Sequence, residues 1–149
     1  MIQVGITGGT TRCAGELIRI LINHPDVEIR RVYTENDTTE QVDNSWRWHS
    51  KENDATEHTY YVWETVHKNY IGTKIADYHK GLYGDTDLKF CDTCDFENID
   101  VLFLCKDARA FMETHKNELP KELKIIDLTG DFRFEDGSHD FVYLSLIHI

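Results

Sequence analysis

A glycine-rich turn near the start of the chain holds the residues best suited to bind a phosphate. Residues 5–15 read GITGGTTRCAG and lie between an alternating apolar run and a stretch with helical spacing. Glycines let the backbone approach a pyrophosphate, and the following helix N-terminus offers free N–H groups and a positive dipole end. We therefore expect the turn to bind a dinucleotide. Its expected contacts are Gly8, Gly9, Thr10, Thr11, Arg12 and Cys13.

One position of this turn departs from the usual glycine spacing. Thr11 stands where a third glycine is usual. Its hydroxyl is expected to donate to a phosphate oxygen. The threonine side chain leaves the backbone less room to approach the phosphate than glycine would. The alternative interpretation is a plain strand-to-helix turn that binds no ligand.

Two residues at the end of the second expected strand bear on the choice of cofactor. This position usually meets the adenosine ribose. Glu35 can accept hydrogen bonds from ribose hydroxyls, which favours NAD and repels a 2′-phosphate, or it can be one more surface acid. Thr34 and Arg12 can instead bind a phosphate oxygen, which favours NADP.

Strands and helices must alternate to place this turn. Residues Ile2–Thr7 and Val27–Thr34 are β-branched and alternating, and Gly15–Asn23 has helical spacing, so the chain opens with a βαβ unit. The later pattern predicts an α/β fold, a doubly wound parallel sheet of the Rossmann type. The later elements are strands over Thr86–Phe90, Asp100–Cys105 and Leu123–Leu128 and a helix over Ala108–Asn117.

The pattern breaks down between the two halves of the expected sheet. Residues 36–71 are rich in Asp, Glu, Asn and Thr, with tryptophans and tyrosines interspersed. Because disordered segments are poor in aromatic residues, we expect an irregular insertion packed on the sheet. A helix over Thr56–Tyr70 is expected within it.

Composition limits the class of protein. The chain has 149 residues and a formal net charge of -11, which repels phosphate backbones and disfavours a nucleic-acid role. No segment approaches the roughly 20 apolar residues of a membrane span, and no signal peptide is expected. The four cysteines are expected to be reduced in a cytoplasmic protein.

Four segments together resemble one enzyme family. GITGGTTRCAGELIRILINHPDVEI (residues 5–29), DYHKGLYGDTDLKF (77–90), DVLFLC (100–105) and KIIDLTGDFRFEDGSHDFVY (124–143) are similar, in order, to the start of N-acetyl-γ-glutamyl-phosphate reductases. The resemblance implies an NADPH-dependent enzyme of arginine biosynthesis, with NAD as a possible cofactor. Such an enzyme reduces an acyl phosphate to an aldehyde through a cysteine thioester, and is expected to be a homo-oligomer when complete.

The resemblance also predicts what this chain lacks. The family's nucleophilic cysteine lies in an NPGC-type motif that this sequence does not contain, so no catalytic residue is expected here. We expect a nucleotide-binding domain over residues 1–143, an atypical tail over 144–149 and a missing catalytic domain. Cys105 is expected beside the cofactor, in a loop that lacks the family's usual HG pair and is shorter.

Two other functions remain open from the residues. The chain can be a non-catalytic NAD(P)-binding module, or a fragment similar to aspartate-semialdehyde dehydrogenase. Cys91 and Cys94 have the spacing of a zinc or redox pair, but no second ligand pair follows, so no metal is expected. Asp131 and Arg133 follow the last strand. They can form a structural clamp with each other or bind a ligand, and both interpretations stay open.

Overall fold

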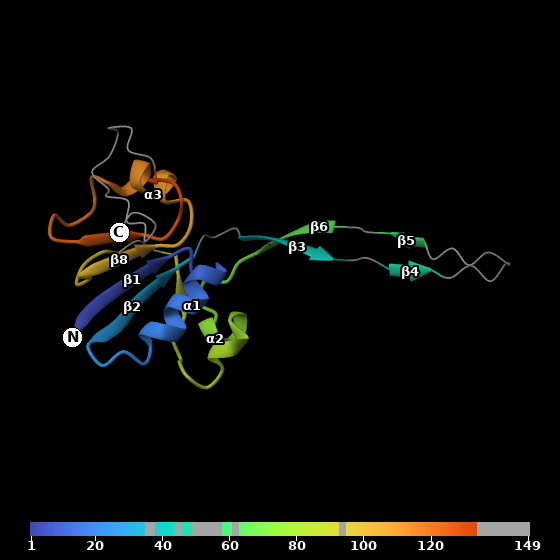
Figure 1. The fold of residues 1–149 in the computed structure, drawn as a ribbon, viewed down its shortest axis with the longest axis horizontal. Coiled ribbons are helices and arrows are strands. Elements are labelled where there is room, and N and C mark those ends of the chain that lie inside the picture. Colours follow the sequence, from blue (N-terminus) through green and yellow to red (C-terminus); the bar gives the residue numbers. More distant parts are fainter. Residues whose placement is uncertain (35–37, 44–45, 49–57, 61–62, 93–94, 134–149) are drawn as a thin grey trace, which may run out of the picture. The chain divides into compact units, whose positions relative to one another are not determined.

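The computed structural model describes residues 1–34, 38–43, 46–48, 58–60, 63–92 and 95–133. These residues form two compact units (Figure 1). The first comprises Met1–Glu35 with Tyr70–Ile149, and the second comprises Asn36–Asn69. We describe each unit by itself.

The first unit is built on a five-stranded parallel sheet, which confirms the predicted fold class. Its order is β7-β2-β1-β8-β9 (Figure 1), so the chain builds outward from β1 to one side and then to the other. The carboxyl ends of β1 and β8 therefore lie at a topological switch point, where open α/β sheets bind ligands. The strands are β1 (Ile2–Thr7), β2 (Val27–Tyr33), β7 (Phe90–Cys91), β8 (Val101–Leu104) and β9 (Lys124–Asp127).

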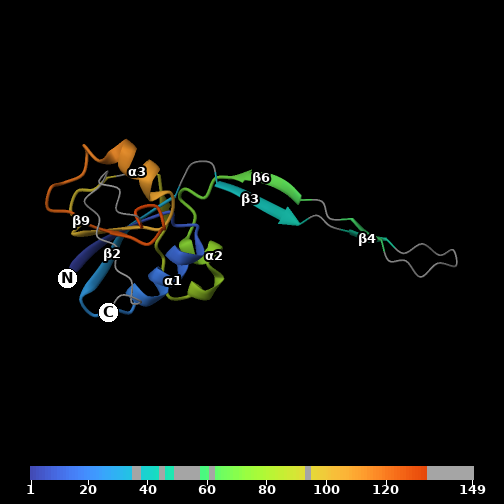
Figure 2. The same cartoon turned by 45° about the horizontal axis from the view of Figure 1, so that its top comes forward.

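Helices cover both faces of this sheet. Helix α1 (Arg12–Leu21) buries Ala14 and Ile18 in the core cluster that contains the β1 side chains Val4 and Ile6. Helix α3 (Ala108–His115) joins the other cluster, which holds Leu102 and Leu104 of β8. Figure 2 shows α3 and α1 on opposite sides of the strands. Apolar residues on both faces of β8 explain its continuous apolar sequence.

A compact segment precedes the edge strand β7. It consists of the short helix α2 (Ile75–Tyr78) and the 3-10 helix η1 (Lys80–Leu82), whose buried Ile75 and Leu82 belong to the α1 core cluster. The strand predicted over Thr86–Phe90 is wrong in extent. The carbonyl of Leu88 accepts from the Ile75 N–H at 2.9 Å, so this segment pairs with the start of α2 before it reaches β2.

The second unit contains two antiparallel ladders. Strand β3 (Thr38–Asp43) pairs with β6 (Trp63–Lys68), and β4 (Trp46–Trp48) pairs with β5 (His58–Tyr60). The helix predicted over Thr56–Tyr70 is therefore wrong. The segment's threonines, valines and aromatic residues favour strands, and cross-strand pairing decides the outcome.

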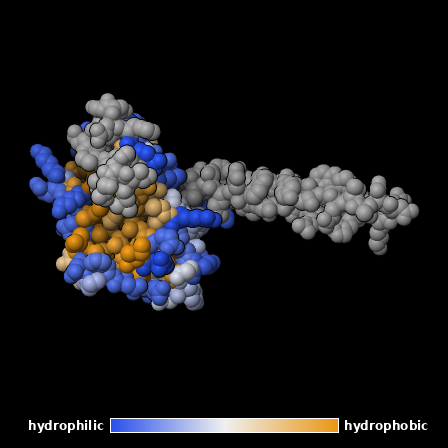
Figure 3. All heavy atoms as spheres, in the orientation of Figure 1, coloured by the Kyte–Doolittle hydropathy of each residue, from blue (hydrophilic) through white to orange (hydrophobic). Residues whose placement is uncertain are grey.

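Apolar side chains also remain at the surface of the first unit. Figure 3 shows a field of apolar residues on one of its faces. The large hydrophobic side chains that stay exposed include Ile126 and Leu128 of the edge strand region, at 42% and 41%. Among the described residues, no helix is long and apolar enough to cross a membrane.

Candidate functional site

The β1–α1 turn is shaped by two glycines in close contact with their neighbours. Gly8 has a φ of +64°, and a Cβ there would stand 2.6 Å from the Lys106 Cβ. A Cβ on Gly9 would stand 2.6 Å from the Val32 Cγ1. Neither position accepts a side chain without displacement, so the backbone itself forms the surface of the turn.

Thr11 closes the turn and begins the helix. Its hydroxyl donates to the Gly8 carbonyl at 2.8 Å and accepts from the Ala14 N–H at 3.1 Å. This N-cap makes α1 begin at Arg12, three residues before the predicted start at Gly15. Donation from this hydroxyl to a phosphate stays a prediction, since in this structure its hydrogen bonds to the Gly8 carbonyl.

The turn leaves backbone donors available. Of the hydrogen bonds among the described residues, none uses the N–H of Thr10, Arg12 or Cys13. Arg12 and Cys13 are the first two residues of α1, where such groups have no partner inside the helix. Three free N–H groups beside the positive end of a helix dipole can hold an anion.

The end of β2 contributes a buried hydroxyl. Thr34 is 6% exposed, and its Oγ1 has no hydrogen-bond partner in the described part of the chain. The Gly9 N–H donates to the Tyr33 carbonyl at 2.8 Å, so this strand end adjoins the turn. A buried polar atom without a partner is costly, which fits a group that meets a ligand. Glu35 lies outside the described residues.

Two cysteines occupy neighbouring strand and helix ends. Cys105 is buried at the end of β8, whereas Cys13 is exposed in the first turn of α1. Burial, then the Cys13 thiol and Asp127, raise the pKa of the Cys105 thiol to about 12. Because it is the thiolate that attacks, Cys105 is unsuited to nucleophilic catalysis near neutral pH and instead lines the end of the sheet.

The β8–α3 turn is held by Asp131. The Asp131 carboxylate accepts from the Arg109 N–H at 3.1 Å, and the Arg109 guanidinium donates to the Asp131 carbonyl at 3.0 Å. Arg109 also lies over the Phe132 ring at 5.1 Å. Asp131 therefore has a structural role at α3 through Arg109, and the clamp between Asp131 and Arg133 stays a prediction.

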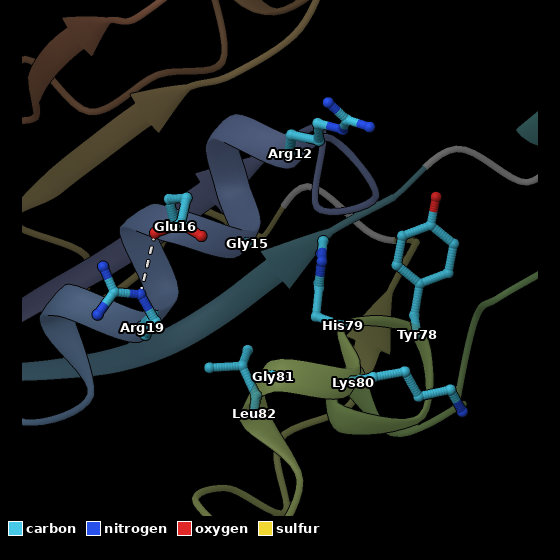
Figure 4. A pocket seen from close by; sticks show the side chains of 9 residues that line it. All are labelled: Arg12, Gly15, Glu16, Arg19, Tyr78, His79, Lys80, Gly81 and Leu82. Atoms are coloured by element: carbon cyan, nitrogen blue, oxygen red, sulfur yellow. Dashed lines mark hydrogen bonds and ion pairs between the residues drawn. The ribbon is translucent and has the colours of Figure 1, made fainter.

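A groove of about 420 Å³ lies between α1 and the α2–η1 segment (Figure 4). Arg12, Arg19 and Lys80 give it positive charge, although Arg19 pairs with Glu16 at 2.9 Å. His79 lines the groove beside the glycine turn. Lys80 and His79 were not predicted as site residues, because no local sequence pattern places the segment 77–90 beside residues 9–15.

Cys91 is the member of the remaining cysteine motif that the structure describes. The Cys91 thiol donates to the Val32 carbonyl at 3.3 Å, and burial raises its pKa, which opposes thiolate formation. Cys94 lies outside the described residues. Among the described residues, no group of three or more His, Cys, Asp or Glu side chains can hold a metal ion.

The chain is similar to a known domain family and to several named enzymes. The family model "Semialdehyde dehydrogenase, NAD binding domain" matches residues 53–146. An N-acetyl-gamma-glutamyl-phosphate reductase of Phocaeicola vulgatus is 39% identical over 146 residues, and one of Bacteroides fragilis is 41% identical over 146 residues. Each match covers 96% of this chain and 34% of the relative. The chain thus spans about a third of the length of these relatives.

Proposed function

Since the chain belongs to the semialdehyde dehydrogenase NAD-binding domain family, we propose that it holds the nicotinamide dinucleotide of an NADP-dependent N-acetyl-γ-glutamyl-phosphate reductase. The dinucleotide supplies the hydride that converts an acyl phosphate to an aldehyde. Residues 1–143 form the nucleotide-binding domain, and the catalytic groups come from a domain beyond it. We place the complete enzyme in the cytoplasm as a homo-oligomer.

The turn between β1 and α1 is the observation that carries this proposal. The free N–H groups of Thr10, Arg12 and Cys13 fit a pyrophosphate, and the bare backbone of Gly8 and Gly9 lets it approach. The role of this domain is to bind and orient the cofactor. Thr11 contributes by capping the helix.

The charges around the turn favour NADP over NAD. Thr34 presents a buried hydroxyl without a partner at the strand end that usually meets the ribose. Arg12 and Lys80 line the adjoining groove and supply positive charge in a chain whose net charge is -11. These three side chains are the ones we propose to hold a 2′-phosphate, with the guanidinium as its strongest donor.

Fluorescence titration of the 149-residue chain with NADPH and NADH tests cofactor binding. We expect NADPH to bind more tightly, and Arg12→Ala to weaken NADPH by roughly tenfold, which is about 1.4 kcal/mol, while changing NADH less. Lys121→Ala removes the same charge near the start of β9, at the opposite edge of the sheet, and serves as the control. Equal affinities for NADPH and NADH would overturn the NADP preference.

A chimera tests the reductase proposal. Residues 1–133 replace the matching part of the B. fragilis relative, and NADPH-dependent reduction of N-acetyl-γ-glutamyl phosphate is measured. Turnover supports the proposal. A folded chimera that binds NADPH without turnover favours the second candidate, a non-catalytic NAD(P)-binding module.

A further inference from the structure

His79 contacts the glycine turn from a distant part of the chain. Its Nε2 lies 2.7 Å from the Gly9 carbonyl oxygen, seventy residues away in sequence. The backbone of His79 is fixed on both sides, because its N–H donates to the Ile75 carbonyl at 2.8 Å and its carbonyl accepts from the Leu82 N–H at 2.9 Å. Figure 4 shows the imidazole directed toward α1.

Packing fixes the direction of the imidazole ring. The ring lies so close to α1 that a Cβ on Gly15 would stand 2.6 Å from its Nδ1. The Tyr78 ring meets it edge-on at 4.9 Å between centroids, and the Phe90 ring lies at 6.4 Å. The ring therefore has little freedom to move its Nε2 away from Gly9.

The contact determines where one backbone N–H points. A carbonyl oxygen only accepts hydrogen bonds, so Nε2 must carry the hydrogen in this contact. In a trans peptide the C=O and the following N–H point in opposite directions, and the described chain has no cis peptide bond. Holding the Gly9 carbonyl toward His79 thus turns the Thr10 N–H away from His79, where no described acceptor takes it.

We infer that His79 is a positioning residue that holds the Gly9–Thr10 peptide so that the Thr10 N–H faces the pyrophosphate of the dinucleotide. Glycine at position 9 has wide conformational freedom, so this peptide needs an external contact to keep one orientation. The Tyr33 carbonyl fixes the Gly9 N–H, and His79 fixes the Gly9 carbonyl. The inference rests on the proposed dinucleotide binding at this turn.

Paired variants of the full chain test this inference. His79→Phe keeps a planar ring against Gly15 but removes the donor, and His79→Gln restores a donor. We expect His79→Phe to raise the Kd for NADPH about five- to tenfold, the usual effect of one lost hydrogen bond, and His79→Gln to recover most of the loss. Binding of adenosine 2′-monophosphate, which has no pyrophosphate, should stay unchanged in both variants.

The outcomes separate the inference from the proposed function. If the natural chain binds no NADPH, the proposed function fails; if it binds NADPH and His79→Phe binds equally well, only the inference fails. A parallel loss of adenosine 2′-monophosphate would show general damage and overturn a positioning role. Should His79→Phe fail to fold, Gly15→Ala displaces the ring while keeping the imidazole, and unchanged NADPH affinity in that variant also overturns the inference.

Discussion

The β1–α1 turn and the β8–α3 turn leave the carboxyl ends of two neighbouring strands, yet the N–H groups at their helix N-termini have different partners. Helix α1 follows the extended Thr11 and leaves the N–H groups of Arg12 and Cys13 free. Helix α3 follows the left-handed Asp107, and its Arg109 N–H is taken by the Asp131 carboxylate.

This difference shows that topology alone does not decide which helix N-terminus binds a ligand. Both helices present the positive end of a dipole at the switch point, and both can attract an anion. In α3 that anion is the protein's own carboxylate, so an external phosphate would have to displace Asp131. Only α1 combines free N–H groups with a bare glycine backbone, which is why we place the cofactor's phosphates there.

Gly8→Ala should disrupt the contact between the two turns and should have the largest effect on the free energy of unfolding. The new Cβ would meet the Lys106 Cβ at 2.6 Å at a residue with φ of +64°. We expect a loss of about 2–4 kcal/mol in the free energy of unfolding, measured by urea denaturation. Gly81→Ala, which meets no heavy atom within 4 Å, is the control; an equally small change at Gly8 would contradict the prediction.

Asp131→Ala should make the second turn resemble the first. The substitution removes the carboxylate that caps α3, so we expect stability to fall by about 1–2 kcal/mol. Sulfate should then stabilise the variant more than the natural chain, because the α3 N-terminus becomes open to an external anion. Asp85→Ala removes an exposed carboxylate elsewhere; an equal sulfate response in all three proteins would refute the role of Asp131.

Thr11→Ala should lower the free energy of unfolding by less than Asp131→Ala does. It removes the acceptor for the Ala14 N–H and the donor to Gly8, so denaturation should show a loss of about 1 kcal/mol. Thr11→Ser keeps both hydrogen bonds and should recover most of the loss. If Ser and Ala behave alike, the hydroxyl does not cap α1.

The two turns also show how far sequence reasoning reaches. Local patterns predicted β1 over Ile2–Thr7 with its observed bounds, and the βαβ unit followed from periodicity. The parallel sheet followed from the alternation of strands and helices. These patterns involve residues that are close in the chain, so a single sequence is enough to recognise them.

Contacts between distant segments were not predictable in the same way. Thr11 was interpreted only as a phosphate donor. Its hydrogen bond to the Gly8 carbonyl was not predicted, because that contact forms only when the turn closes. His79 and Gly9 meet only after the α2–η1 segment packs on α1, and Asp131 meets Arg109 across two elements. The strands of residues 58–68 likewise depend on pairing with residues 38–48, which helical spacing does not reveal.

The Cys13 and Cys105 thiols are expected to differ in their effect on stability, and the difference appears only at alkaline pH. The pKa of Cys105 is raised from 9.0 to about 12, chiefly by burial. Below pH 9 the thiol is protonated in the folded and unfolded chains, and its contribution to stability is fully present. Between pH 9 and 12 only the unfolded chain releases the proton, so stability must fall as pH rises.

We therefore expect the free energy of unfolding to decline more steeply above pH 9 in the natural chain than in Cys105→Ala. Comparing slopes removes the shared effect of the net charge and any constant loss from the smaller side chain. Cys13→Ala should alter the slope less than Cys105→Ala, because burial raises the Cys105 pKa more than the Cys13 thiol does. Parallel curves for the natural chain and Cys105→Ala would mean that the end of β8 is open to water, and the Cys105 site would then resemble the solvent-facing turn of α1.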